Sequence, residues 1–150
     1  MQRLNYAAAS PEALPKLLAV SAFVHHCGLD PKLLELIFLR ASQINGCAWC
    51  LEFHSRRALH AGETQQRLNL LAAWRDAPVY SPKERAALEW TEAVTQIAGH
   101  QVPDEIYQRA RQEFHDTDLT NLTIAVGMIN LWNRLNVAFQ TDLSSVPQPT

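Results

Sequence analysis

The chain has 150 residues, of which 47% are hydrophobic and 19% are charged, and its formal net charge at pH 7 is −2. This length predicts a single domain, residues 1–150, that can bury a sizeable core. The small net charge, without blocks of like charges, argues against binding to nucleic acid or to a membrane surface. Apolar stretches such as 17–24 are too short to span a membrane, and residues 1–10 make a poor signal peptide, so we expect a cytoplasmic protein.

Helix signals follow one another along the whole chain. Pro11 stands at the start of the first expected helix, Gly28 at its end, and Asp30 at the cap of the second. Ser81 and Glu84 form a capping box at the start of a later helix. The expected helices cover about residues 11–28, 31–44, 47–60, 64–74, 82–98, 103–114 and 118–140. Because no segment alternates with the period of a β-strand, we predict an all-α fold, a compact bundle of six to seven helices.

The last expected helix, 118–140, is apolar over most of its circumference. Ile124, Leu131 and Val137 widen its apolar face beyond a single stripe. A helix of this kind is buried on several sides, which in so short a chain indicates a subunit interface and therefore a homo-oligomer. We expect the packed core to span about residues 12–139 and the polar, proline-containing tail, 141–150, to be loose.

The segment 42–54 carries the most informative motif, because Cys47 and Cys50 form a C-x-x-C pair and His54 follows four residues later. Gly46, preceded by an asparagine, favours a break between two helices. Both thiols are therefore expected in the first turn of a helix, where the partial positive charge of the helix N-terminus favours thiolate over thiol. Cys47, Cys50 and His54 share one helical face at positions i, i+3 and i+7. The pattern indicates redox or nucleophilic sulfur chemistry.

A metal-binding structural or regulatory module is an alternative, because thiolates and imidazole are also zinc ligands. A structural zinc site requires a fourth ligand, and none of His25, His26, Cys27 and His60 has ligand spacing to the motif. Adjacent histidines cannot both face one point on a helix. We therefore expect His25 and His26 at the surface and Cys27 as an inert thiol.

Glu35 lies on an otherwise apolar helix, well ahead of the cysteine pair. A solvent-exposed position on the polar side of that helix is the simplest interpretation. In a straight helix Glu35 would lie about 18 Å from Cys47. Glu35 can reach the thiols only if the chain bends near Asn45-Gly46, or if the second helix packs against the cysteine helix.

Taken together, these residues resemble the alkylhydroperoxidase D-like (AhpD-like) family, part of the wider carboxymuconolactone decarboxylase superfamily. The shared pattern is Glu35, then twelve residues to Cys47, then Cys50 and His54. The segments 39–47, 84–88, 91–93 and 130–134 are also similar to that family, so the resemblance covers about residues 12–139. It implies an all-helical fold that assembles as a dimer, trimer or hexamer, and it implies no cofactor.

The resemblance also implies a thiol-dependent peroxidase that reduces small hydroperoxides. In that pattern Cys50 attacks the peroxide and becomes a sulfenic acid, and Cys47 then closes the disulfide. Glu35 and His54 form the proton relay, and an unidentified thiol or dithiol reductant restores the thiols. The field of the helix N-terminus, taken alone, favours Cys47 as the attacking thiol.

Trp49 departs from the family pattern, because the founding peroxidase carries a second histidine within its C-x-x-C. Here the tryptophan is expected to alter the proton relay, and it could shield the thiols from water or line a substrate pocket. A second alternative to the peroxidase is a helical decarboxylase or lactone-processing enzyme in which the cysteines are incidental. That branch of the superfamily does not rely on a C-x-x-C pair.

Overall fold

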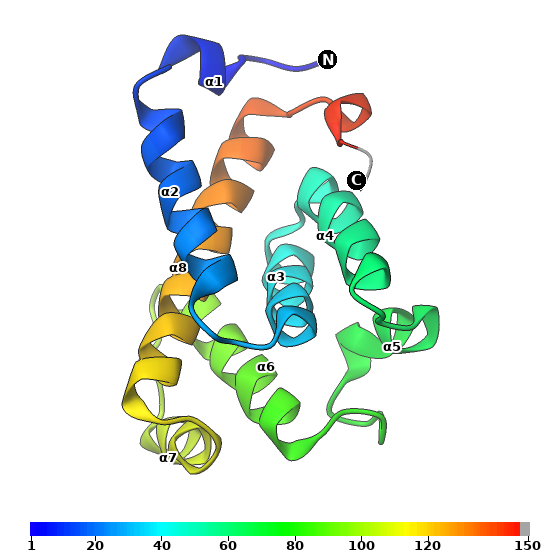
Figure 1. Cartoon of the computed structure of the whole chain (residues 1–150), viewed down its shortest axis with the longest axis vertical. Helices are drawn as coiled ribbons and strands as arrows, with labels where there is room; N and C mark the ends of the chain where they lie inside the picture. Colours follow the sequence, from blue (N-terminus) through cyan, green and yellow to red (C-terminus); the bar gives the residue numbers. More distant parts are fainter. Residues whose placement is uncertain (148–150) are drawn as a thin grey trace.

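The computed structural model describes residues 1–147, and within this range the chain is built from helices and contains no strand (Figure 1). The elements are α1 (Tyr6–Ala9), α2 (Ala13–His26), α3 (Pro31–Asn45), α4 (Ala48–His60), α5 (Gln65–Leu70), η1 (Leu71–Ala73), α6 (Pro82–Thr95), α7 (Asp104–Glu113), α8 (Asp116–Phe139) and η2 (Leu143–Ser145). The prediction of an all-α fold is confirmed. The helix predicted over 64–74 is α-helical only as far as Leu70 and continues as the 3-10 turn η1, and α1 is an additional short helix.

The local signals in the sequence account for most helix ends. The Asp30 carboxylate accepts a hydrogen bond from the third backbone amide of α3, and Ser81 and Glu84 form the predicted capping box at the start of α6. Gly46 ends α3 in the left-handed conformation (φ 67°), which favours glycine. The unexpected helix α1 is capped by the Asn5 side chain, a signal that was present in the sequence.

Helix α3 lies at the centre of the bundle, and its most extensive contacts are with α4, α6 and α8 (Figure 1). All residues from 33 to 39 are buried, so this part of α3 is covered on every side. Phe38 belongs to the core cluster that includes Ile129 of α8, whereas Leu36 belongs to a second cluster with Leu88 of α6. An acidic residue within this stretch therefore has no polar side of the helix to occupy.

The ends of the described chain pack onto the bundle. Tyr6 of α1 places its ring 6.4 Å from that of Trp132 on α8. Near the other end, the Trp49 indole donates a hydrogen bond to the Ser145 hydroxyl of η2 (3.0 Å), and Val146 is buried. These contacts lie between the described part of the tail and α4, the looseness of the tail stays a prediction, and residues 148–150 lie outside the described residues.

Part of the wide apolar face of α8 is left uncovered by the rest of the chain. Ile124, Leu131 and Val137 are between 38% and 46% exposed, and Leu18 and Phe23 of α2 are about half exposed. Assembly through these helices stays a prediction. Across residues 1–147, no helix combines the length and the apolar character needed to cross a membrane.

Candidate active site

The two cysteines of the motif stand where α4 begins. Cys47 is the N-cap residue, and its sulfur accepts a hydrogen bond from the backbone amide of Cys50 in the first turn (3.3 Å). The two residues are joined by a disulfide, with a Cα–Cα distance of 5.3 Å, and both are essentially inaccessible to solvent. The predicted position at the helix N-terminus is therefore confirmed.

Glu35 is brought to the motif from the preceding helix. The chain reverses at Gly46 and α3 packs along α4, and either of these was predicted to be sufficient for its participation. Glu35 is only 3% exposed; its Oε2 lies 2.7 Å from Nδ1 of His54, and its Oε1 accepts from Nε of Arg57 at 2.9 Å. The solvent-exposed interpretation of Glu35 is wrong, because α3 is covered on all sides.

Electrostatics fix the protonation of this cluster. Burial alone would raise the pKa of Glu35, but the hydrogen bonds and charges of His54 and Arg57 outweigh burial and lower that pKa. Glu35 is therefore a carboxylate at neutral pH and can only accept hydrogen bonds. Nδ1 of His54 must then carry the proton that lies between them. The second ring nitrogen, Nε2, remains available to exchange a proton with another group.

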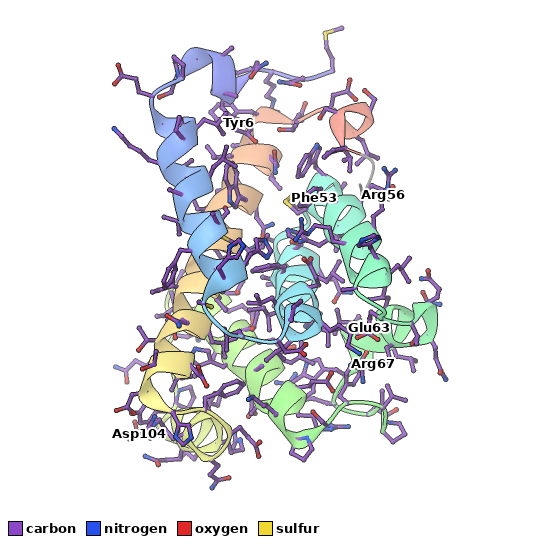
Figure 2. The ribbon with its side chains drawn as sticks, viewed as in Figure 1. Tyr6, Phe53, Arg56, Glu63, Arg67 and Asp104 are labelled. Atoms are coloured by element: carbon purple, nitrogen blue, oxygen red, sulfur yellow. A yellow bond between two sulfur atoms is a disulfide. The ribbon has the colours of Figure 1, made fainter. Side chains whose placement is uncertain are left out.

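A cavity of about 510 Å³ opens between α2, α4 and α8, with α1 at one end. Its wall is formed by Tyr6, Leu14, Leu18, Ser21, Ala22, His25, Trp49, Cys50, Phe53, His54, Arg57, Met128 and Trp132. Figure 2 shows Tyr6 and Phe53 in the upper half of the bundle. Cys50 and His54 both line the cavity, and Cys47 does not. The geometry thus places the second cysteine of the motif in the cavity wall, although the helix field is strongest at the first.

Trp49 lines this cavity, which is one of the two positions that the sequence predicted for it. Its ring stacks on that of Phe53, with 5.1 Å between centroids, and its indole nitrogen bonds to Ser145. The side chain is therefore held as part of the wall near Cys50.

Asn136 on α8 is a functional candidate that the sequence analysis missed. It is 4% exposed, and its Nδ2 donates to the sulfur of Cys50 (3.4 Å). Its Oδ1 accepts from the hydroxyl of Tyr6 (3.2 Å), which fixes the orientation of the amide. The available signal was the recurrence of asparagines along a helix whose apolar face is wide. A neighbouring one, Asn133, binds Ser42 near the end of α3 instead.

His25 and Arg57 also belong to the cavity, contrary to the expectation that His25 lies at the surface. Burial, followed by the charge of Arg57, lowers the pKa of His25. Arg57 lies seven residues after Cys50 on the same helical face, a spacing that was visible in the sequence.

Cys27 is a half-buried free thiol that donates to the carbonyl of Val24. Within residues 1–147, no three His, Cys, Asp or Glu side chains are grouped so as to hold a metal ion.

Comparison with known proteins places the chain in a family. A model of the carboxymuconolactone decarboxylase family matches residues 8–93. The uncharacterized protein YdfG of Bacillus subtilis (strain 168) is 37% identical over 144 residues, which are 96% of this chain and 98% of that protein. The chain belongs to the carboxymuconolactone decarboxylase family.

Within this family the chain is an AhpD-like member, as the resemblance indicated. A crystal structure from Agrobacterium tumefaciens, of a protein of unknown function assigned provisionally to antioxidant defence as AhpD, superposes with a TM-score of 0.92 at 43% identity, covering 95% of this chain and 97% of that one. An uncharacterized peroxidase-related protein from Ralstonia eutropha JMP134, described as an alkylhydroperoxidase AhpD core, superposes with a TM-score of 0.80 at 20% identity, covering 91% of this chain and 73% of that one. The second similarity shows the shared fold alone.

Proposed function

We propose that this AhpD-like protein is a thiol-dependent peroxidase that reduces hydroperoxides with Cys50 as the attacking thiol. One observation carries the proposal: Cys50 and His54 line the same cavity, and the imidazole of His54 is bonded to a buried carboxylate. A cysteine in the wall of a ligand-sized cavity, beside a group that can move protons, is what peroxide reduction requires.

The reaction begins with the reduced dithiol. The Cys50 thiol gives its proton to Nε2 of His54, and the resulting thiolate attacks the distal oxygen of the hydroperoxide. The O–O bond breaks, and the leaving alkoxide takes that proton from Nε2. Cys50 becomes a sulfenic acid, and the sulfur of Cys47 then attacks its sulfur, so that the disulfide forms and the hydroxide leaves as water with the proton of the Cys47 thiol. A thiol or dithiol reductant supplies the two electrons that restore both thiols.

Three side chains support these steps. Glu35 holds the His54 ring in one tautomer and stabilises the imidazolium form. The Asn136 amide, already directed at the sulfur, stabilises the Cys50 thiolate by donating a hydrogen bond. Cys47 is buried beside Cys50 and away from the cavity, a position that suits the thiol that closes the disulfide.

Cysteine substitutions test the proposal. Hydroperoxide consumption with dithiothreitol as reductant should be lost in Cys50→Ser, because no other thiol lines the cavity wall. Cys47→Ser should still consume one equivalent and leave a sulfenic acid on Cys50, which mass spectrometry would detect after trapping. Cys27→Ser is the matched control and should retain full turnover. Full turnover in Cys50→Ser would refute the proposal.

The family match also favours a second candidate, a decarboxylase or lactone-processing enzyme. This candidate predicts activity on a carboxylated lactone that survives replacement of both Cys47 and Cys50. The double variant assayed with such a lactone therefore separates the two functions.

A further inference from the structure

We propose that Arg57 forms an anion subsite in the cavity, and that the preferred substrate is an organic hydroperoxide with an apolar body and a carboxylate. The part of this inference that concerns a hydroperoxide substrate rests on the proposed peroxidase function. The binding of an apolar carboxylate beside Arg57 can be measured without that function.

The first support is the chemistry of the cavity wall. Most of the wall is apolar or aromatic, and no aspartate or glutamate is among its residues. Among the lining residues within 1–147, Arg57 is the one permanent cation, because arginine stays protonated at every physiological pH. The lowered pKa of His25 keeps this second imidazole uncharged at neutral pH. A carboxylate entering the cavity thus meets one fixed positive charge and no acidic side chain in the wall.

The second support is the way in which Arg57 is held. Its Nε is bonded to the buried Oε1 of Glu35, and its guanidinium lies 5.6 Å from the centre of the Phe53 ring. Within residues 1–147, its two terminal nitrogens make no hydrogen bond. The Arg57 side chain is 42% exposed, whereas that of Glu35 is 4% exposed. Glu35 therefore orients the guanidinium from the inside and leaves a fork of N–H donors for an incoming carboxylate.

The third support is the spacing along α4. Cys50, His54 and Arg57 all line the cavity at positions i, i+4 and i+7 of one helix. The rise of an α-helix separates Cys50 from Arg57 by roughly 10 Å. A ligand bound at both ends must bridge this separation with an apolar chain or ring, and Met128 and Leu18 are among the apolar residues of the wall. The cavity volume of about 510 Å³ is that of a site for an organic molecule, and hydrogen peroxide would leave most of it unfilled.

The kinetic test compares two substrates that differ only in charge. Nonanoic acid with a hydroperoxide on its terminal carbon places the two groups at a suitable separation, and its methyl ester removes the anion. We would measure the second-order rate constant for oxidation of Cys50 in the reduced full-length protein with each compound. The acid should react about tenfold faster than the ester, as expected for a charge-assisted hydrogen-bonded pair. Equal rate constants would overturn the proposal.

Variants assign the preference to Arg57. Because Arg57 also bonds Glu35, Arg57→Gln can slow both reactions, so the readout is the ratio of the acid to the ester rate constant. That ratio should fall to about one in Arg57→Gln. In the matched control Arg56→Gln it should be unchanged, because Arg56 pairs with Glu52 and does not line the cavity. A ratio that Arg57→Gln leaves intact would also overturn the proposal.

A binding measurement separates this inference from the peroxidase function. Calorimetric titration of wild-type protein with nonanoate and with nonan-1-ol needs no turnover and no variant. Nonanoate should bind about tenfold more tightly than the alcohol, and the difference should disappear in Arg57→Gln. If Cys50 is oxidised by no hydroperoxide but nonanoate is preferred, the peroxidase proposal fails and the anion subsite stands. Equal affinity for acid and alcohol removes the subsite whatever the enzyme does.

Discussion

Among the buried glutamates of residues 1–147, Glu35 and Glu92 resemble each other closely and differ in the groups that they bind. Glu35 is 3% exposed and Glu92 is 9% exposed. Burial alone would raise the pKa of each, but hydrogen bonds from neighbouring donors lower both pKa values. Glu92 is bonded to Arg40 (2.7 Å), Arg75 (2.6 Å) and the indole of Trp74 (2.8 Å). None of these three partners exchanges a proton near neutral pH.

Glu35 instead shares its carboxylate between an arginine and His54. Histidine is the one side chain whose ordinary pKa lies near neutrality, and His54 lines a cavity that Cys50 also lines. Burial and a lowered pKa are therefore common to a structural ion pair and to the pair for which we propose a catalytic role. The partner of the carboxylate, and the access of that partner to a ligand, distinguish the two.

The largest expected effect is on activity. Glu35→Gln should lower kcat/KM for hydroperoxide reduction by about 100-fold, because His54 loses the carboxylate that orients it and supports its charge. Glu92→Gln should change kcat/KM by less than about threefold, since Glu92 does not line the cavity. Steady-state assays of both variants measure the contrast. A similar loss in the two would remove the distinction between these glutamates.

The next effect is on stability and concerns Glu92. Glu92→Ala should lower the free energy of unfolding by about 2–3 kcal/mol, because it leaves Arg40 and the Trp74 indole without their acceptor. Urea denaturation followed by circular dichroism at neutral pH measures this loss. The partly exposed pair of Glu52 and Arg56 provides the control, and Glu52→Ala should cost less than about 1 kcal/mol. A smaller loss for Glu92→Ala than for Glu52→Ala would contradict the structural role of Glu92.

Acid should weaken the fold through the same two glutamates. Each has a pKa below its ordinary value of 4.5 in the folded protein, so each contributes stability that is fully present above pH 4.5. That contribution is lost as the pH falls through the lowered folded pKa. The free energy of unfolding should therefore decrease between about pH 5 and pH 3, and the decrease should be smaller in Glu92→Gln, which has one titrating group fewer. Equal decreases would show that Glu92 does not contribute.

The smallest effect concerns two asparagines of α8, Asn136, which binds the sulfur of Cys50, and Asn133, which does not. Asn136→Leu should raise the pKa of the reduced Cys50 thiol and slow peroxide reduction about fivefold, because the thiolate loses a hydrogen-bond donor worth about 1 kcal/mol. Asn133→Leu should destabilise the protein without changing this pKa, because Asn133 binds Ser42 and Asn45 instead. Titration of the thiolate by its ultraviolet absorbance in a Cys47→Ser background measures both. An unchanged thiol pKa in Asn136→Leu would exclude Asn136 from the site.

The sequence by itself determined the helices and the position of the cysteine pair, because the signals for both are local. Caps such as Asp30 and Ser81 act within three residues, and Gly46 forces the break that places Cys47 and Cys50 at a helix start. His54 and Arg57 follow on the same helical face, since they lie one and two turns beyond Cys50. These relations hold whatever the helix packs against.

The tertiary structure alone decided which distant groups surround the sulfur. Glu35 meets His54 across 19 residues because α3 is enclosed between α4, α6 and α8, so that its one carboxylate must find partners inside the protein. Asn136 reaches Cys50 across 86 residues, and His25 reaches the cavity because α2 lies across it. Helical periodicity predicts on which face of a helix a side chain lies. Which other helix contacts that face depends on the packing of whole helices. The sequence could therefore place the two thiols, whereas their chemical surroundings depended on the fold.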